Sequence, residues 1–182
     1  NAESLERMEK VDTLVVDKTG TLTEGKPAVT AVITAEGVEE ADLLRLAASV
    51  EQASEHPLAA AIVNAAKARD IPLAKVMGFD SPTGKGAIGM VERKRIALGN
   101  AKFLGELNIP IADLAAGAEK LRNEGATAIF MAINGKPAGV FGISDPVKAS
   151  TPAALTALRA QGIRIIMLTG DNRTTANAIA RK

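Results

Sequence analysis

The sequence has no cysteine, no tryptophan and no tyrosine, and it has a single histidine, His56. The absence of cysteine excludes disulfide bonds and metal sites with thiolate ligands. Four phenylalanines are the only aromatic residues, so the core must be built from Ala, Val, Ile and Leu. The five methionines are scattered along the chain, and we expect them to serve apolar packing rather than soft-metal binding.

An excess of one charge and long hydrophobic runs are also missing. The 22 basic and 21 acidic residues give a net charge of +1, which offers no reason to expect a nucleic-acid partner or an anionic membrane surface. No apolar run reaches the roughly 18 residues of a membrane-spanning helix, so we expect no direct membrane insertion of this chain. The first residues do not form a signal peptide. The 182 residues, enough for one to two domains, are interpreted as a cytosolic fragment of a longer protein.

Both ends of the chain have the pattern of a parallel α/β domain. Residues 11–16 and 163–168 are short, mainly apolar runs typical of strands buried on both faces, and a polar loop follows each of them. The carboxyl ends of parallel strands meet at one edge of a sheet. We therefore expect Asp17 and the tripeptide Thr169-Gly170-Asp171 to lie close together.

The middle of the chain has the pattern of an antiparallel sheet with helices. Residues 28–34 predict a strand, and the short apolar runs between residues 76 and 100, cut by glycines, predict strands joined by tight turns. Asn134-Gly135 between two apolar runs predicts a hairpin with a two-residue turn. The remaining expected elements are helices at residues 39–52, 54–69, 111–123 and 150–161, and one that starts near residue 173.

These patterns predict a parallel α/β domain that is interrupted after its first strand by an inserted α+β domain with an antiparallel sheet. The expected boundaries are 1–26 and 144–182 for the parallel domain and 27–143 for the insertion. An insertion into one loop requires its two ends to lie close together, so residues 27 and 143 should be neighbours in space.

The first motif is Asp17-Lys18-Thr19-Gly20-Thr21, directly after the first predicted strand. An aspartate in this position can attack a phosphoryl group and form an aspartyl phosphate. The Thr and Gly residues offer hydroxyl and backbone N–H groups to phosphate oxygens, and Lys18 adds positive charge. The alternative is a turn after a strand with an Asx hydrogen bond.

Two further segments belong with this motif in the predicted topology. Thr169-Gly170-Asp171 follows the neighbouring strand, although such a tripeptide is also common in turns. Asp145-Pro146 with Lys148 lies at the predicted return crossing between the domains, where a simple turn before a capped helix is the alternative.

A third group of residues has the chemistry to bind a nucleotide. Glycines let a backbone approach a flat base or a phosphate without a clash at Cβ. An acid and an amide can recognise the base, and an imidazole can stack on it or form a hydrogen bond with it. The alternative for His56 is a residue at a helix start, with Ser54 as the cap and Pro57 in the first turn. The candidate segments are Ser54-Glu55-His56-Pro57-Leu58, Gly84-Lys85-Gly86 and Gly99-Asn100.

The seven residues from Asp17 to Thr23, Asp-Lys-Thr-Gly-Thr-Leu-Thr, resemble the phosphorylation signature of P-type ATPases, members of the haloacid-dehalogenase-like superfamily. The resemblance implies that Asp17 is phosphorylated by ATP, and that its carboxylate and the main-chain carbonyl of Thr19 hold Mg²⁺. Thr169-Gly170-Asp171 resembles the next signature of the family, with Thr169 bonded to the transferred phosphoryl group. The catalytic set implied by the resemblance is Asp17, Lys18, Thr19, Thr169, Gly170 and Asp171.

The segment Ser54 to Leu58 resembles the nucleotide-domain signature of heavy-metal pumps, and the two glycine segments follow in the family's order. The implied fold is a haloacid-dehalogenase-like phosphorylation domain, incomplete in this chain, with an inserted nucleotide-binding domain. The basic cluster 93–95 is interpreted as a solvated hairpin tip, with electrostatic steering of ATP as the alternative. The implied nucleotide-binding residues are Glu55, His56, Gly84, Gly86, Gly99 and Asn100.

The resemblance also implies partners that this chain does not contain. They are the membrane helices, the actuator domain and the remainder of the phosphorylation domain, which carries a later Gly-Asp-Gly-x-Asn-Asp segment and a preceding lysine. We expect the chain to lie at the cytoplasmic face of a membrane and to bind ATP with little turnover by itself. The copper(I) or silver exporters are the most similar group, while zinc, cadmium or lead stay open as the transported metal.

Two alternatives from other functional classes remain. A soluble haloacid-dehalogenase-like phosphatase usually carries Asp-x-Asp, with the second aspartate as general acid. Thr19 stands at that second position, which favours a longer-lived phosphoenzyme. The other alternative is a nucleotide-binding module without catalysis.

Overall fold

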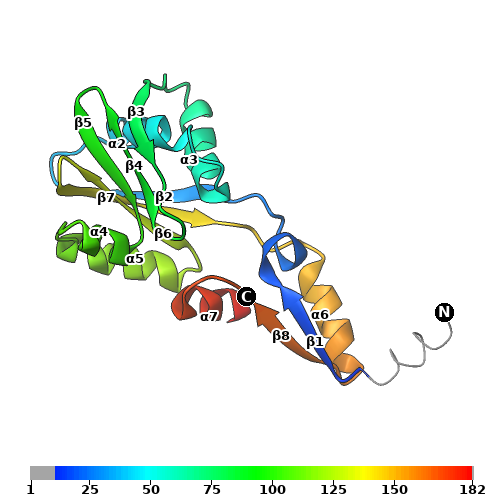
Figure 1. The fold of residues 1–182 in the computed structure, drawn as a ribbon. Helices are drawn as coiled ribbons and strands as arrows, with labels where there is room; N and C mark the ends of the chain where they lie inside the picture. The colour runs from blue at the N-terminus through cyan, green and yellow to red at the C-terminus, as the bar shows by residue number, and fades with distance from the viewer. Residues whose placement is uncertain (1–10, 182) are drawn as a thin grey trace. The chain divides into compact units, whose positions relative to one another are not determined.

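The computed structural model describes residues 11–181, which form two compact units (Figure 1). Unit 1 combines the residues up to Lys26 with Asp145–Asp171, and unit 2 combines Pro27–Ser144 with the residues from Asn172 onward. Within the described range, no helix is long and apolar enough to cross a bilayer.

Unit 1 is built around a two-stranded parallel sheet. The strands pair in register from Thr13 with Arg164 to Asp17 with Leu168, so both end at the same edge. Helix α6 packs against β8. The elements of unit 1 are β1 (Thr13–Asp17), the turn η1 (Lys18–Leu22), α6 (Thr151–Ala160) and β8 (Arg164–Leu168).

The prediction that these two strands are buried on both faces is wrong for the described residues. Val15, Ile166 and Leu168 are 58%, 41% and 62% exposed. Their exposure alternates with the partly buried Val16, Ile165 and Met167, because successive side chains of a strand point to opposite faces. Among the described residues of unit 1, α6 is the single helix, so one face of the sheet is left uncovered.

Unit 2 contains a six-stranded antiparallel sheet in the order β2-β7-β6-β5-β4-β3. Helices α2 and α3 cover one face, and α4 and α5 cover the other (Figure 1). The strands are β2 (Ala28–Thr34), β3 (Val76–Asp80), β4 (Gly86–Val91), β5 (Lys94–Gly99), β6 (Thr127–Ile133) and β7 (Lys136–Ser144). The helices are α2 (Glu40–Glu51), α3 (Pro57–Lys67), α4 (Ala101–Glu106), α5 (Ala112–Asn123) and α7 (Arg173–Arg181). The predicted fold class, a parallel-sheet domain with an antiparallel α+β insertion, is confirmed.

The sheet of unit 2 divides the core into two clusters. Along β6, Ile129, Met131 and Ile133 pack towards α2 and α3. The alternate residues Ala128, Phe130 and Ala132 pack towards α4 and α5. Because both faces are covered, the interior strand β7 is buried over most of its length. Most of the core consists of Ala, Val, Ile and Leu, as expected from the composition, but its largest fully buried side chains are the aromatic Phe130 and Phe141.

The methionines differ from one another in burial, although the sequence predicts that all of them serve packing. Met131 is fully buried, but Met77 and Met90 are 66% and 45% exposed. These two residues are cross-strand partners on β3 and β4, and β3 lies at the edge of the sheet. The expectation is therefore wrong for Met77 and Met90, while Met8 lies outside the described residues.

Local sequence signals explain the main connections of unit 2. Asn134 and Gly135 have φ values of 51° and 77°, which confirms the predicted primed turn between β6 and β7. Ala28 pairs with Ser144 and Val29 pairs with Ile143, so the ends of the inserted segment are neighbours, as predicted.

Helix α7 belongs to unit 2 in the structure, whereas the predicted domain boundaries place it in the phosphorylation domain. Its Thr175 hydroxyl donates a hydrogen bond of 3.1 Å to the carbonyl of Ala126, and α7 packs against α5. Thr175 and Ala178 are 1% and 4% exposed, so these contacts cover the apolar side of α7. The boundaries 1–26, 27–143 and 144–182 stay a prediction.

Candidate functional site

The phosphorylation motif begins at the carboxyl edge of the sheet in unit 1. Asp17 is the last residue of β1 and lies beside Leu168 on β8, so Thr169 follows at the same edge. The Asp17 side chain is exposed. The backbone then turns through Thr19 in an extended conformation and Gly20 with a φ of 77°. This positive φ is accessible to glycine at little cost, which explains the glycine at the third position after Asp17.

Lys18, Thr169 and Asp171 form one polar cluster beside Asp17. The Lys18 Nζ atom forms an ion pair with Asp171 Oδ2, and the two side chains are 12% and 15% exposed. The Thr169 hydroxyl donates to Asp171 Oδ2 and accepts from the Asp171 backbone N–H, each at 3.1 Å. The structure therefore joins residues 153 positions apart that the sequence assigns to one site.

The residues implied for Mg²⁺ offer oxygen ligands only. Mg²⁺ prefers such ligands and usually keeps several waters, with one or two carboxylates and substrate phosphates completing its shell. Across residues 11–181, no group of three or more His, Cys, Asp and Glu side chains is arranged to bind a metal ion. The Asp17 carboxylate and the Thr19 carbonyl thus fit a magnesium ion shared with a phosphate, and do not form a complete protein site.

The loop after Asp17 is held by Asp145. Asp145 Oδ1 accepts the Lys26 backbone N–H at 2.9 Å, and Oδ2 accepts the Gly25 N–H at 3.2 Å. The fully buried hydroxyl of Thr23 donates to the same Oδ2 at 2.6 Å. Asp145 therefore does more than form a turn, because its carboxylate fixes the segment that follows the motif.

Two further residues of the return segment contact the motif. Lys148 Nζ donates to the Gly20 carbonyl at 2.6 Å, and the Thr151 hydroxyl donates to the Leu22 carbonyl at 2.8 Å. Both acceptors lie in the turn η1, so the return segment supports the backbone next to Asp17. The contacts made by Thr23 and Thr151 were not predicted from the sequence.

The glycines at the ends of β4 and β5 face each other. Gly86 and Gly99 are cross-strand partners. A Cβ on Gly86 would lie 2.0 Å from the Leu98 carbonyl oxygen, and one on Gly99 would lie 2.6 Å from the Lys85 carbonyl oxygen and from Phe103 Cδ1. Close backbone approach and the Phe103 ring therefore require both glycines. Gly84 differs, because its φ is 71° and a Cβ added there would have no neighbouring atom within 4 Å.

Asn100 connects the glycine loop to helix α4. Its Oδ1 accepts the Phe103 backbone N–H at 2.8 Å, which makes Asn100 the N-cap of α4. Its Nδ2 donates to the Gly84 carbonyl at 3.3 Å, and its backbone N–H donates to the Lys85 carbonyl at 3.2 Å. The structure thus brings Gly84, Gly86, Gly99 and Asn100 together and leaves one amide hydrogen of Asn100 for a ligand.

His56 is the N-cap of helix α3, so the prediction that Ser54 caps this helix is wrong. His56 Nδ1 accepts the Leu58 backbone N–H at 3.1 Å, while Ser54 Oγ accepts the His56 backbone N–H at 3.3 Å. Pro57 occupies the first helical position, which places the cap directly before it, at His56. Because Nδ1 is an acceptor, the neutral ring carries its proton on Nε2, and this N–H and the ring face are free for a ligand. Glu55 beside it is exposed.

Glu51 is a residue of this region that was not predicted from the sequence. Its side chain is buried at the end of α2, with the residue 9% exposed. Burial raises the pKa of the Glu51 carboxyl to about 7, and a hydrogen bond with Ser54 partly opposes this rise. The Ser54 backbone N–H also donates to the Glu51 carbonyl at 2.9 Å. The signal in the sequence was an acidic residue directly after the buried run 46–50 of a predicted helix.

The candidate nucleotide residues thus form two groups within unit 2. Residues 51–56 lie at the junction of α2 and α3, and the glycines with Asn100 lie at the ends of β4 and β5. Among the hydrogen bonds of the described residues, none joins the two groups. A ligand that contacts both groups would therefore contact two surfaces, each of which is held in place by its own hydrogen bonds.

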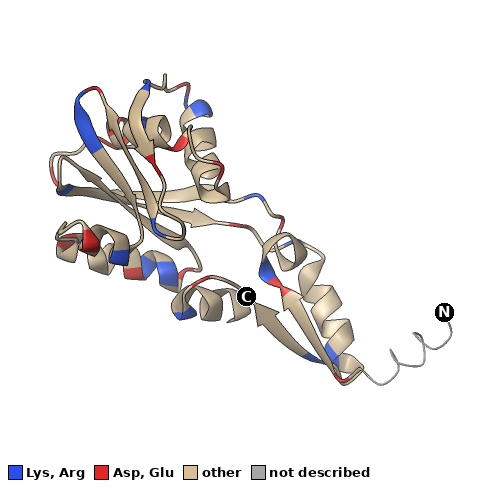
Figure 2. Cartoon of the chain, in the orientation of Figure 1, with Lys and Arg blue, Asp and Glu red and all other residues tan. Residues whose placement is uncertain are grey.

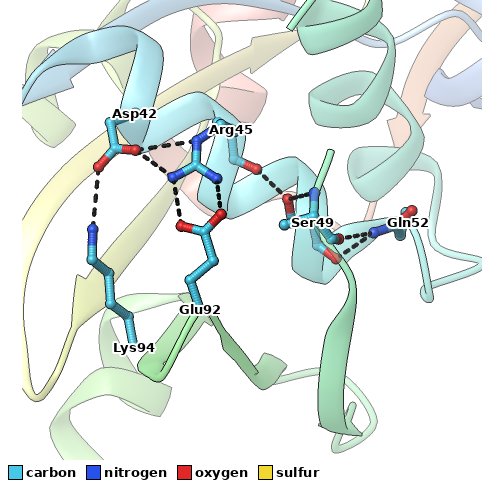
Figure 3. Close-up of polar contacts among 7 residues, drawn as sticks. Asp42, Arg45, Ser49, Gln52, Glu92 and Lys94 are labelled. Carbon is cyan, nitrogen blue, oxygen red and sulfur yellow. Dashed lines mark hydrogen bonds and ion pairs between the residues drawn. The ribbon is translucent and has the colours of Figure 1, made fainter. Parts of the chain in front are cut away.

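An ion-pair network links α2 to the turn between β4 and β5 (Figure 3). Arg45 donates to both carboxylate oxygens of Glu92, at 2.8 and 3.0 Å, and to Asp42 Oδ1 at 2.7 and 3.2 Å. Lys94 Nζ lies 3.5 Å from Asp42 Oδ2. The hydrogen bond from Arg45 is the main reason why the pKa of Asp42 is lowered. Lys94 therefore forms an ion pair with Asp42, so the interpretation of the basic cluster 93–95 as a solvated hairpin tip is wrong for this residue.

Comparison with known proteins identifies the class to which this arrangement belongs. Residues 11–182 match the family model of haloacid dehalogenase-like hydrolases. The chain therefore belongs to the haloacid dehalogenase-like hydrolase family.

The relatives make the likeness more specific. The chain is 54% identical over 182 residues to the silver exporting P-type ATPase of Salmonella typhimurium, and 51% identical over 180 residues to the copper-exporting P-type ATPase of Legionella pneumophila. These matches cover 100% and 99% of this chain but 22% and 24% of the relatives. The chain thus spans about a quarter of the length of these relatives. The predicted resemblance to copper- and silver-exporting P-type ATPases is confirmed.

Solved structures agree with this likeness. A zinc-transporting PIB-type ATPase has a TM-score of 0.73 and 36% identity, over 97% of this chain and 28% of that chain. The catalytic domain of the CPx-ATPase CopB-B, described for its conformational changes upon nucleotide binding, has a TM-score of 0.72 and 30% identity, over 100% of this chain and 62% of that chain. The fold is therefore that of the catalytic domain of heavy-metal P-type ATPases.

Proposed function

We propose that this chain is the ATP-binding and aspartyl-phosphorylation region of a P-type ATPase that exports a heavy-metal cation. Copper(I) is the first candidate for this cation. The observation that carries the proposal is the position of Asp17, exposed at the carboxyl edge of β1 beside the Lys18–Asp171 ion pair. The similarity to silver- and copper-exporting relatives supports the choice of metal. The proposed location is the cytoplasmic face of a membrane, with the membrane helices and the actuator domain of the same pump as partners.

In the proposed reaction, a carboxylate oxygen of Asp17 attacks the γ-phosphorus of ATP. A bond forms between this oxygen and phosphorus, and the bond between phosphorus and the β,γ-bridging oxygen breaks, so that ADP leaves. Mg²⁺, bound by the Asp17 carboxylate and the Thr19 carbonyl, would neutralise phosphoryl charge. Lys18 and Thr169 supply a positive charge and a hydroxyl at the same edge.

The hydrogen bonds of Asp145 with the segment after the motif support this proposal. The N–H groups of Gly25 and Lys26 and the hydroxyl of Thr23 all bind Asp145. This arrangement fixes the chain after the nucleophile, and phosphoryl transfer depends mainly on positioning and charge neutralisation. The phosphatase alternative lacks its usual general acid, because Thr19 stands where a second aspartate would act.

For the nucleotide, we assign the base to the two groups of unit 2. Gly84 leaves open space beside its backbone, where a flat ring can approach, and Gly86 and Gly99 keep the neighbouring strand ends in close contact beside it. His56 offers its ring face and its Nε2–H, because Nδ1 is engaged in the cap. Glu51 adds an acceptor for the amino group of adenine, and it joins Glu55 as the second acidic candidate of this segment.

Calorimetric titration with ATP tests the assignment. We expect a Kd between about 10 µM and a few mM, which corresponds to about 4 to 7 kcal/mol. Losing a polar contact to the base costs about 1 to 3 kcal/mol, so His56→Asn should weaken ATP roughly five- to more than a hundredfold. Asparagine preserves the helix cap, so the loss would report on the ring.

Asp17→Asn is the matched control for this titration, since it removes the nucleophile and should leave ATP binding nearly unchanged. We also expect Mg²⁺ to matter little for binding, because the residues assigned to it belong to unit 1 and the base contacts to unit 2. Normal binding by His56→Asn together with loss of binding by Asp17→Asn would show that the site assignment is wrong.

A further inference from the structure

A cavity of about 340 Å³ opens in unit 2, beside the end of helix α4. Its floor is formed by Ala97 on β5 and Ala132 on β6, which are cross-strand partners and are 5% and 1% exposed. Leu107 and Ile109, which follow α4, form its apolar wall. The hollow exists because two small side chains meet where larger ones would fill the space. Its volume lies in the range of small-molecule sites, about 300 to 1,000 Å³.

The polar groups at the cavity are hydrogen-bond donors. Arg95 lines it with an exposed side chain, and none of the described acidic residues lies within ion-pair distance of this guanidinium. Asn134 also lines it, and its Oδ1 is occupied by the Arg95 backbone N–H at 2.8 Å, which leaves the amide N–H groups. No acidic side chain of residues 11–181 is part of the lining. The cavity therefore favours a negatively charged group at its polar end.

Neighbouring basic residues differ from Arg95. Lys and Arg gather at the start of β5 (Figure 2). Arg45 and Lys94 are neutralised by Asp42 and Glu92, as the close-up of the network shows (Figure 3). Arg95 is thus a basic side chain of this region with its charge available to a ligand. Arg95 lies four residues from Gly99, about 13 Å along the strand, so the polar end of the cavity is set apart from the candidate nucleotide residues.

We propose that this cavity binds a small organic carboxylate with a compact apolar chain. The carboxylate binds the Arg95 guanidinium, whose planar donor pair matches a carboxylate in two parallel hydrogen bonds. The apolar chain lies over Ala97 and Ala132, where its burial is favourable. A phosphate without an apolar part would leave this floor uncovered, and an ammonium group would be repelled by Arg95.

Titration of the whole chain with hexanoate, followed through backbone amide NMR resonances, tests the proposal. We expect saturable shifts that centre on Ala97, Leu107, Ile109 and Ala132. Acetate has the same head group without the chain, and hexylammonium has the chain with the opposite charge. Each should bind at least about tenfold more weakly than hexanoate, because each lacks one of the two interactions.

Arg95→Gln should weaken hexanoate about tenfold. Arg93→Gln is the matched control, because it removes the same charge from the same hairpin outside the cavity lining and should leave binding unchanged. Both variants should bind ATP like the unmodified chain, which separates this proposal from the assignment of the nucleotide site. Equal effects of the two variants, equal binding of hexylammonium, or hexanoate shifts outside the cavity would overturn the proposal.

Discussion

Glu51→Gln should stabilise the protein at neutral pH and at the same time weaken ATP binding. The Glu51 carboxyl is buried at the end of α2, and burial raises its pKa from 4.5 to about 7. In the unfolded chain the same group titrates near its ordinary value. Between these two pKa values the folded state therefore binds more protons than the unfolded state.

The sign of the effect follows from this difference in bound protons. A group whose pKa is raised in the folded state contributes stability below its unfolded pKa, and this contribution is lost as the pH rises through the folded pKa. A rise from 4.5 to about 7 corresponds to about 3 kcal/mol, so Glu51 should lower the free energy of unfolding by about this amount between pH 4.5 and about pH 8. Glutamine has nearly the same shape as glutamate but does not titrate in this range, so the substitution removes this pH dependence of the free energy of unfolding.

Urea unfolding measures the effect, with far-UV circular dichroism as the signal because the chain has no tryptophan or tyrosine. The stability of Glu51→Gln minus that of the unmodified chain should be near zero at pH 4.5 and should approach about 3 kcal/mol at about pH 8. Glu55→Gln, four residues later, is the control, because it removes the same charge from an exposed side chain.

Two results would refute this account of Glu51. A stability difference that is the same at both pH values would show that the Glu51 carboxyl does not titrate as its burial requires. Unchanged ATP affinity in Glu51→Gln would remove Glu51 from the proposed nucleotide site. The expected combination is a more stable protein that binds ATP more weakly. It is typical of a residue that serves function and destabilises the fold.

Three further substitutions test the supporting structure. Asp145→Ala removes the acceptor of the Gly25 and Lys26 N–H groups and the bond from the buried Thr23 hydroxyl, which keeps the Lys18 carbonyl as an acceptor. The variant should lose about 1 to 3 kcal/mol in urea unfolding, and no loss would show that the carboxylate does not fix this loop. Gly86→Ala should destabilise unit 2 by about 1 to 3 kcal/mol or more, because its Cβ would meet backbone atoms. Gly84→Ala should cost about 1 to 2 kcal/mol from its positive φ alone, so a larger loss than for Gly86→Ala would contradict the packing argument.

The order and type of most elements could be predicted because local patterns determine them, although the short helix α4 was missed. Two apolar runs separated by the Asn134-Gly135 turn predict the β6–β7 hairpin, and the structure has it at that position. The meeting of Asp17 with residues 169–171 follows from topology, since two parallel strands end at one edge. Pro57 also contains the information that was missed for His56, because proline at the first helical position places the cap directly before it.

Contacts between distant residues and degrees of burial could not be predicted. Asp145 binds Thr23 across 122 positions, and nothing in either segment alone specifies this pairing. The close approach of Gly86 and Gly99 depends on the register of β4 and β5 and on the Phe103 ring. The burial of Glu51 depends on how α2 lies on the sheet, which a single sequence does not specify.

The central claim is that the nucleotide is bound by unit 2 while Asp17 belongs to a separate site in unit 1. An NMR titration of the whole chain with ATP in the absence of Mg²⁺ tests this claim most directly. We predict that the amide resonances of residues 51–56, 84–86 and 99–100 shift with one binding constant while those of Asp17 and Thr169 stay in place. Shifts that centre on Asp17 and Thr169, with residues 51–56 and both glycine segments unchanged, would contradict the account.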